Sequence, residues 1–276
     1  ELSDSSIKSV DDINSFKALK TVADGIQKHK DDLGVKGAFT SAGFDSSSDW
    51  RFKTQLAGVP LYYEFKADGI TEQPATITGS TLQNSTVEPT QLISKAGEDA
   101  NSEFAFGDAV FYQNGTWAWT DLSNAGVESD NVGMLPIYVG GDGEENQGLT
   151  TGSENYWCIN SKASDLDKQA TKDFLEWMIT SDDGKNALAS EMGFSTPFKT
   201  FSDMKTENPL IDAYCESLKA GKDTVPWTYT MIPSEQWKND LGSALLEYAQ
   251  GTGSWDAVKT AYVDGWATEY AAANEG

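Results

Sequence analysis

The stretch FGDAVFYQNGTWAW, residues Phe106–Trp119, is the part of this sequence that says most about the fold. An apolar run is followed by Asn114 and Gly115, residues that favour a tight turn because they tolerate positive φ. Trp117 and Trp119 are two positions apart, so an extended chain points their indoles to opposite faces. The pattern predicts a strand, a turn and a strand over about 104–119, with one indole in a core and the other lining a cleft.

Tryptophan is more prominent in this chain than histidine, the side chain that most often transfers protons in catalysis. The 276 residues include nine tryptophans and one histidine. We expect His29 to be solvated in the polar tail of the first helix, which removes catalytic triads and histidine metal sites. The sequence has no G-x-S-x-G, H-E-x-x-H or G-x-x-x-x-G-K-[ST] motif. We therefore expect no catalytic residue, no cofactor and no metal site.

The charge of the chain excludes two classes of partner. The formal net charge is −23, and such an anionic surface repels both nucleic-acid phosphates and acidic lipid headgroups. The hydrophobic content is 38%, and no apolar run approaches the roughly 20 residues of a membrane span. We expect no nucleic acid as partner and no direct membrane insertion of this chain. The two cysteines, Cys158 and Cys215, allow one bridge or two buried free thiols, and we favour the thiols.

Helices and short, separated strands are expected along the chain. Hydrophobic spacing and capping residues predict helices over 9–33, 49–56, 90–95, 164–180, 181–191, 209–220, 234–249 and 254–272. Strands are expected at 37–41, 132–136 and 154–160, and residues 225–230 form an aromatic loop or strand. This mixture indicates an α/β or α+β domain.

The candidate binding residues are tryptophans in expected loops or at strand ends, with acidic residues beside aromatic ones. A pyranose ring has apolar C–H faces that stack on flat aromatic rings, and hydroxyl groups that bind carboxylates. The candidate tryptophans are Trp50, Trp117, Trp227 and Trp237, and the candidate acids include Asp45, Asp49 and Glu154. Trp177, Trp255 and Trp266 fall on apolar helix faces, so we expect them in the core.

Four features, in this order along the chain, resemble one known family. The first is the helix start at Ser9–Ile13, and the second is the Phe106–Trp119 stretch, which is similar to the family pattern F-x-x-G-x-A-x-x-x-x-G-x-W. The third is Tyr156–Asn160, followed by Phe174–Trp177 and Gly193–Pro197. The fourth is a closing helix pair with Trp237 at its entrance and Trp266 near its end. The chain is thus similar to roughly the latter two-thirds of an extracellular solute-binding protein (family 1) of a carbohydrate ABC transporter, the group that includes maltose-binding protein.

The resemblance implies an α/β, periplasmic-binding-protein-like (type II) fold of two lobes with sugar held in the cleft between them. Residues 1–158 and 206–276 would form the C-terminal lobe, and residues 159–205 would cross to the N-terminal lobe, whose first part is absent from this chain. The resemblance implies that Trp117 stacks on a sugar ring, with Trp50 and Trp237 as further aromatic contacts. Asp45 or Asp49 would bind hydroxyls. Glu154 and Trp227 would lie near the cleft.

The function implied by the resemblance is reversible oligosaccharide binding and delivery to the permease subunits of an ABC importer, without catalysis. The protein would be extracellular or periplasmic and anchored as a lipoprotein in its full-length form. Two alternatives remain open at this point. One is a glycan-active enzyme or carbohydrate-binding module, and the other is a receptor of the same fold for a peptide, a polyamine or a metal chelate.

Overall fold

A computed structural model describes residues 7–44, 48–82, 95–152, 156–194, 196, 198–201 and 207–275. The chain divides into two compact units. The first consists of Glu1–Asn114, Leu135–Thr151 and Gly221–Gly276, and the second of Gly115–Met134 and Gly152–Ala220. The second unit contains all of the segment 159–205 that is expected to cross to another lobe. That lobe assignment stays a prediction.

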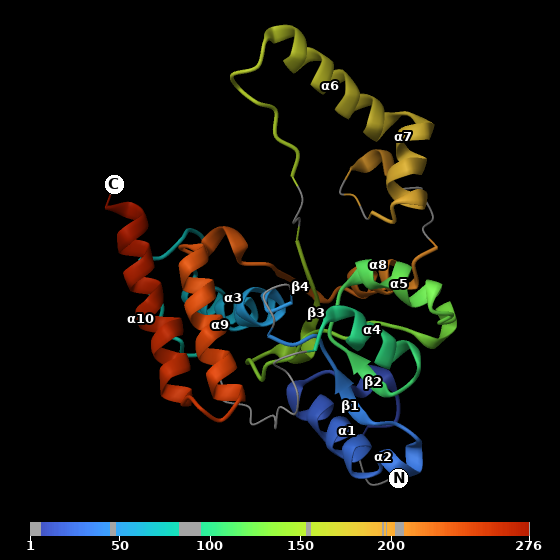
Figure 1. The fold of residues 1–276 in the computed structure, drawn as a ribbon, viewed down its shortest axis with the longest axis vertical. Coiled ribbons are helices and arrows are strands. Elements are labelled where there is room, and N and C mark those ends of the chain that lie inside the picture. Colours follow the sequence, from blue (N-terminus) through green and yellow to red (C-terminus); the bar gives the residue numbers. More distant parts are fainter. Residues whose placement is uncertain are drawn as a thin grey trace. The chain divides into compact units, whose positions relative to one another are not determined.

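The larger core of the first unit lies among three helices. These are α3 (Ala57–Asp68), α9 (Glu235–Ala249) and α10 (Trp255–Asn274). Figure 1 shows α9 and α10 side by side, and Trp237, Tyr262 and Trp266 between the helices are at most 1% exposed. Both helices begin where the sequence predicts, because the hydroxyls of Ser234 and Ser254 accept backbone N–H groups of the first turn.

Two small parallel sheets complete the ordered framework of the first unit. Strand β1 (Gly37–Thr40) pairs with β2 (Ala109–Tyr112), and β3 (Gln147–Thr151) pairs with β4 (Asp223–Pro226). Helix α1 (Phe16–Lys28) packs Val22 and Ile26 against Ala38 of β1. Further elements of this unit are η1 (Val10–Asp12), α2 (Lys30–Leu33), η2 (Arg51–Leu56), α4 (Gly97–Ala105), η5 (Glu144–Asn146) and η8 (Tyr229–Met231).

The second unit is helical and has a small core. Its elements are η3 (Thr116–Ala118), α5 (Trp119–Asn124), η4 (Ser129–Asn131), α6 (Asp165–Thr180), α7 (Asp182–Asn186), η6 (Ala187–Glu191), η7 (Lys199–Phe201) and α8 (Pro209–Lys219). Leu188, Ala189 and Phe201 form the buried cluster. Helix α7 crosses close to α6 at Gly184, where an added Cβ would lie 2.6 Å from the Cα of Met178.

The α/β class and most helices are confirmed, but three expected strands are wrong. The chain after Gly115 turns into η3 and α5, so Trp117 and Trp119 are not on one strand. Residues 132–136 are irregular. Within the expected strand 154–160, the described residues Tyr156–Asn160 are also irregular. The strand in this part of the chain is instead β3, which ends earlier, at Thr151. The apolar runs in these three segments have the composition of strands. A strand forms only where a second strand is available as its hydrogen-bonding partner.

Other helical expectations need adjustment. The first expected helix divides into η1, α1 and α2, and the helix that begins near Asp49 continues through η2 into α3 as far as Asp68. Helix α4 was not predicted, and most of the expected helix 90–95 lies outside the described residues.

Only the C-terminal part of the apolar face of α6 contributes to a core, where Met178 packs against the buried cluster, and the expectation that Trp177 lies in the core is wrong. Leu166 is 80% exposed, Phe174 56% and Trp177 47%. Cys158 is exposed and Cys215 partly exposed, and both thiols are free, so only the expectation of burial is corrected. Within the described part of the chain, no helix is long and apolar enough to span a membrane.

Candidate functional site

Trp117 combines exposure with a fixed position at the start of η3. Its indole is 47% exposed. A Cβ added to Gly115 would lie 2.1 Å from a carbon of the Trp117 ring, so the indole lies directly over the glycine backbone. Gly115 has φ −124°, which any residue can adopt. The glycine is therefore required for space, and the expectation that it supplies positive φ is wrong.

The side chain that caps α8 fixes the backbone beside Trp117. The Asn208 side chain donates from Nδ2 to the carbonyl oxygen of Thr116 at 2.9 Å, and its Oδ1 accepts the Leu210 N–H at 3.0 Å. Asn208 is 8% exposed, so these hydrogen bonds are shielded from water. The Asn208-Pro209 pair marks a helix start in the sequence, but nothing local links it to Thr116, 92 residues earlier.

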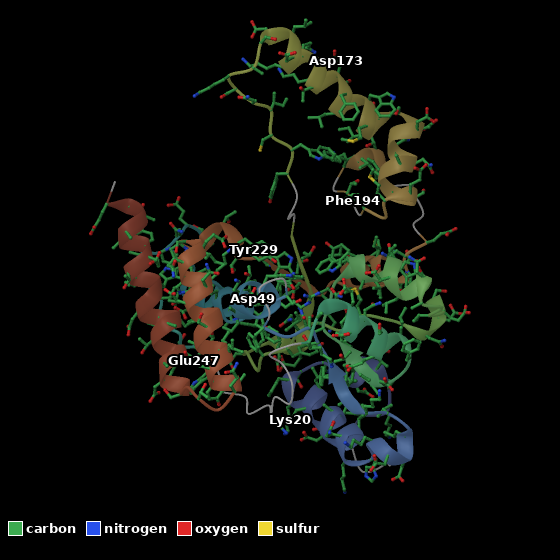
Figure 2. All side chains as sticks on the ribbon, viewed as in Figure 1. Lys20, Asp49, Asp173, Phe194, Tyr229 and Glu247 are labelled. Atoms are coloured by element: carbon green, nitrogen blue, oxygen red, sulfur yellow. The ribbon has the colours of Figure 1, made fainter. Side chains whose placement is uncertain are left out.

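Asp49 and Trp50 lie at the entrance to η2 in the first unit. The Asp49 carboxylate lies 2.8 Å from Lys53 Nζ, and Lys53 also donates to Asn239 Oδ1 of α9 at 2.9 Å. Asp49 (labelled in Figure 2) keeps 19% of its side chain exposed. The pairing ties the turn before η2 to α9, and it leaves part of the Asp49 side chain accessible to solvent.

Trp50 is partly exposed and has a cation against its ring. The Arg51 guanidinium carbon lies 4.3 Å from the centroid of the Trp50 ring. This distance is within the range of a cation–π interaction. The Trp50 ring and the Arg51 guanidinium, which belong to adjacent residues, therefore form a local cation–π pair.

Trp227 and Tyr229 form a stacked pair just after β4. Their ring centroids are 5.5 Å apart and their planes differ by 5°. The Trp227 N–H donates to the Thr151 carbonyl at 2.9 Å, which continues the β3–β4 pairing. Both side chains are partly exposed, and Figure 2 labels Tyr229. Tyr229 was missed at the level of sequence, although the alternation of aromatic residues at 227 and 229 was the signal that could have identified it.

The structure corrects the expectation for Trp237. Its exposure is 0%, and its ring packs edge-to-face on Trp266 with centroids 5.2 Å apart. A side chain without accessible surface has no face for a sugar ring to stack on. Asp45 and Glu154 lie outside the described residues.

A shallow depression elsewhere on the first unit contains none of the predicted site residues. It is lined by Tyr62, Tyr63, Lys66, Gly143, Gln147 and Asp223. Burial, and then the nearby carboxylate of Glu144, raises the pKa of Tyr63, whose hydroxyl therefore stays protonated and donates to Gln147. Lys66 pairs with Asp223 at 3.2 Å. The polar groups of this depression therefore pair with one another. The described residues include no group of three or more His, Cys, Asp or Glu side chains that could hold a metal ion.

Comparisons with known proteins point to one family. A family model described as bacterial extracellular solute-binding protein matches residues 2–214. The structure is similar to a solved structure described as a chitin oligosaccharide binding protein, with a TM-score of 0.63 and 17% sequence identity. The match covers 95% of this chain and 65% of that one, so this chain spans about two thirds of the relative's length, and the likeness concerns the fold. No curated protein matches the sequence.

Proposed function

Because this chain belongs to the bacterial extracellular solute-binding proteins, we propose that it is the substrate-binding component of an ABC importer and that its solute is an oligosaccharide. The observation that carries the choice of solute is Trp117, an indole 47% exposed that lies over Gly115 in a fixed geometry. Flat aromatic rings bind the apolar faces of ligands at a low cost in conformational entropy. The similar fold described as a chitin oligosaccharide binding protein supports this choice.

Other exposed aromatic groups extend the proposal. We assign stacking roles to Trp50 and to Trp227, which Tyr229 supports from one side. The Asp49 side chain, which is 19% exposed, would accept hydrogen bonds from sugar hydroxyls. Asp45 and Glu154 remain proposed contacts on the resemblance alone. Binding is reversible in this proposal, and no residue acts as a catalyst.

The partners follow from the same proposal. Exposed apolar side chains in the second unit, including Trp157 (49%) and Trp177 (47%), would pack against a further lobe of the complete receptor. Trp157 and residues 159–205 would supply this contact. The receptor would act outside the cytoplasmic membrane, be anchored as a lipoprotein and deliver its sugar to the permease subunits.

A fluorescence titration tests the assignment of solute. The chain, and a longer polypeptide that adds an upstream lobe, would be titrated with chitin, malto-, xylo-, manno-, galacto- and fructo-oligosaccharides. We expect a saturable change in tryptophan emission with one sugar class. A response to peptides or polyamines instead would contradict the sugar assignment. Release of shortened sugars during the titration would indicate a glycan-active enzyme.

A further inference from the structure

Asn114 and Gly115 form the only Asn-Gly sequence in the chain. An asparagine before glycine cyclises readily, because glycine has no Cβ to crowd the approach of its own backbone nitrogen to the asparagine side chain. Asparagine is one of the residues that limit the chemical lifetime of proteins. We propose that Asn114 is a site of spontaneous deamidation, and that the contacts of Tyr112 and Trp117 keep the reaction slow in the folded chain. Neither contact involves a bound sugar, so the site is independent of the proposed function.

The reaction needs only water and a base. The base removes the proton of the Gly115 N–H, and the nitrogen attacks Cγ of Asn114. The new N–Cγ bond forms, the Cγ–Nδ2 bond breaks, and ammonia leaves with a proton from water, which produces a five-membered succinimide. Water then opens this ring. Cleavage of the bond between the nitrogen and Cγ leaves aspartate at position 114, whereas cleavage at the main-chain carbonyl leaves isoaspartate, in which the backbone runs through Cβ and Cγ.

A hydrogen bond holds the Asn114 side chain. Its Nδ2 donates to the Tyr112 hydroxyl at 2.7 Å, and Asn114 is partly buried. Tyr112 is the last residue of β2, and its ring contacts Phe104 of α4 with centroids 5.5 Å apart. Cyclisation expels Nδ2 as ammonia, so the hydrogen bond to the Tyr112 hydroxyl has to be given up. The Tyr112 contact therefore opposes the reaction.

The backbone of Gly115 is restricted as well. A Cβ added there would lie 2.1 Å from a carbon of the Trp117 ring, so the indole occupies the space that a side chain would fill. The Gly115 carbonyl accepts the Ala118 N–H at 3.0 Å, and the Thr116 carbonyl accepts the Asn208 side chain at 2.9 Å. Because the Gly115 nitrogen has to move to reach Cγ of Asn114, these contacts resist the rotation of its peptide group.

Peptide mass spectrometry of the chain after incubation in mildly alkaline buffer tests the site. Exchange of an NH2 group for OH changes the peptide mass, and chromatography separates isoaspartate from aspartate. We expect Asn114 to be the first asparagine modified when the chain is unfolded in urea, and to react more slowly in the folded chain. Earlier modification of another asparagine in urea would overturn the site, and equal rates in the folded and unfolded chain would overturn the protection.

Tyr112→Phe isolates the hydrogen bond, because it keeps the ring and removes only the hydroxyl. We expect Asn114 in this folded variant to deamidate about three- to tenfold faster, which corresponds to the loss of one hydrogen bond. Tyr63→Phe is the matched control, because it removes a tyrosine hydroxyl that donates to Gln147 instead. An unchanged rate in Tyr112→Phe, or an equal acceleration in Tyr63→Phe, would refute the role of Tyr112.

Trp117→Ala tests the second contact. Without the indole the Gly115 backbone gains space, so we expect Asn114 to react faster than in the original chain. Trp177→Ala is the control, because it removes an indole with the same 47% exposure that is distant in sequence from Asn114. Equal rates in the Trp117→Ala variant and the original chain would show that the indole does not protect the site.

Discussion

The indole nitrogen of Trp237 donates a hydrogen bond to the backbone carbonyl of Tyr262 at 3.0 Å, inside the core between α9 and α10. The two rings also contact each other, with centroids 5.5 Å apart. The same core contains Trp266, whose Nε1 donates to the carbonyl of Pro74 at 2.9 Å. These buried tryptophans therefore join the two closing helices to each other and to the segment after α3.

Removal of a core indole should destabilise the first unit. We expect Trp266→Ala and Trp237→Ala each to lower the free energy of unfolding by about 3–5 kcal/mol, because a large cavity remains. Trp237→Phe keeps most of the packing and should cost about 1–2 kcal/mol, because the hydrogen bond to the Tyr262 carbonyl is lost and the smaller ring leaves a gap. Urea denaturation followed by circular dichroism measures these values. Alanine variants as stable as the original chain would contradict this account of the core.

Trp117 should affect sugar binding and leave stability nearly unchanged. We expect Trp117→Ala to weaken binding by about 1–3 kcal/mol, the range of other aromatic stacking contacts. Isothermal titration calorimetry with chitin oligosaccharides gives the affinity. Trp177→Ala is a matched control, because both indoles are 47% exposed and both belong to the second unit. Equal affinities for the original chain and Trp117→Ala would remove Trp117 from the site.

Gly115 should act through the ring above it. Its φ is ordinary, so alanine introduces no backbone strain, but the new Cβ would meet the Trp117 ring and displace it. We expect Gly115→Ala to raise the sugar Kd about three- to tenfold, or roughly 0.6–1.4 kcal/mol. Gly133→Ala in the same unit is the control, because a Cβ there meets no atom within 4 Å. Calorimetry that gives both variants the same affinity would show that the ring position is irrelevant to binding.

Acid should weaken the contact between β1 and α4 through Glu103. Burial alone would raise the pKa of this carboxyl, but hydrogen bonds from Lys95 and Thr40 outweigh it and hold the pKa below its usual value. A lowered pKa in the folded state means that the stabilisation is fully present above the unfolded pKa of about 4.3, and is lost as pH falls through the folded value.

The sign of this effect can be tested with two variants. Thr40→Val removes the hydroxyl that donates at 2.7 Å, so the pKa of Glu103 should rise towards its usual value. Glu103→Gln should reduce the acid dependence of the unfolding free energy below about pH 5. A series of urea titrations from neutral to acid pH measures both effects. An unchanged slope in Glu103→Gln would show that other carboxyl groups dominate.

Local sequence was sufficient wherever a structure depends on near neighbours. Ser164, Ser234 and Ser254 predict helix starts because each hydroxyl accepts an N–H three residues later. Gly34 predicts a helix end, and it adopts φ +73° there. The expected strand at 37–41 and the α/β class follow from similar short-range patterns.

The candidate site depended on contacts that sequence spacing does not encode. Trp117 and Trp237 look alike as tryptophans at expected loop or helix ends, but one is 47% exposed and the other fully buried. The difference arises because α3 and α10 enclose Trp237, while Trp117 lies on the backbone of its own turn.

Patterns among near neighbours were therefore enough to predict the caps, the periodic helices and the chemical inventory of aromatic and acidic groups. Long-range packing set which tryptophans remain accessible, left Gly115 as space for an indole and brought Asn208 to Thr116. The two kinds of feature differ in the range of the interactions that produce them. Capping and hydrophobic periodicity act within a few residues, whereas burial depends on segments that meet only when the chain has folded.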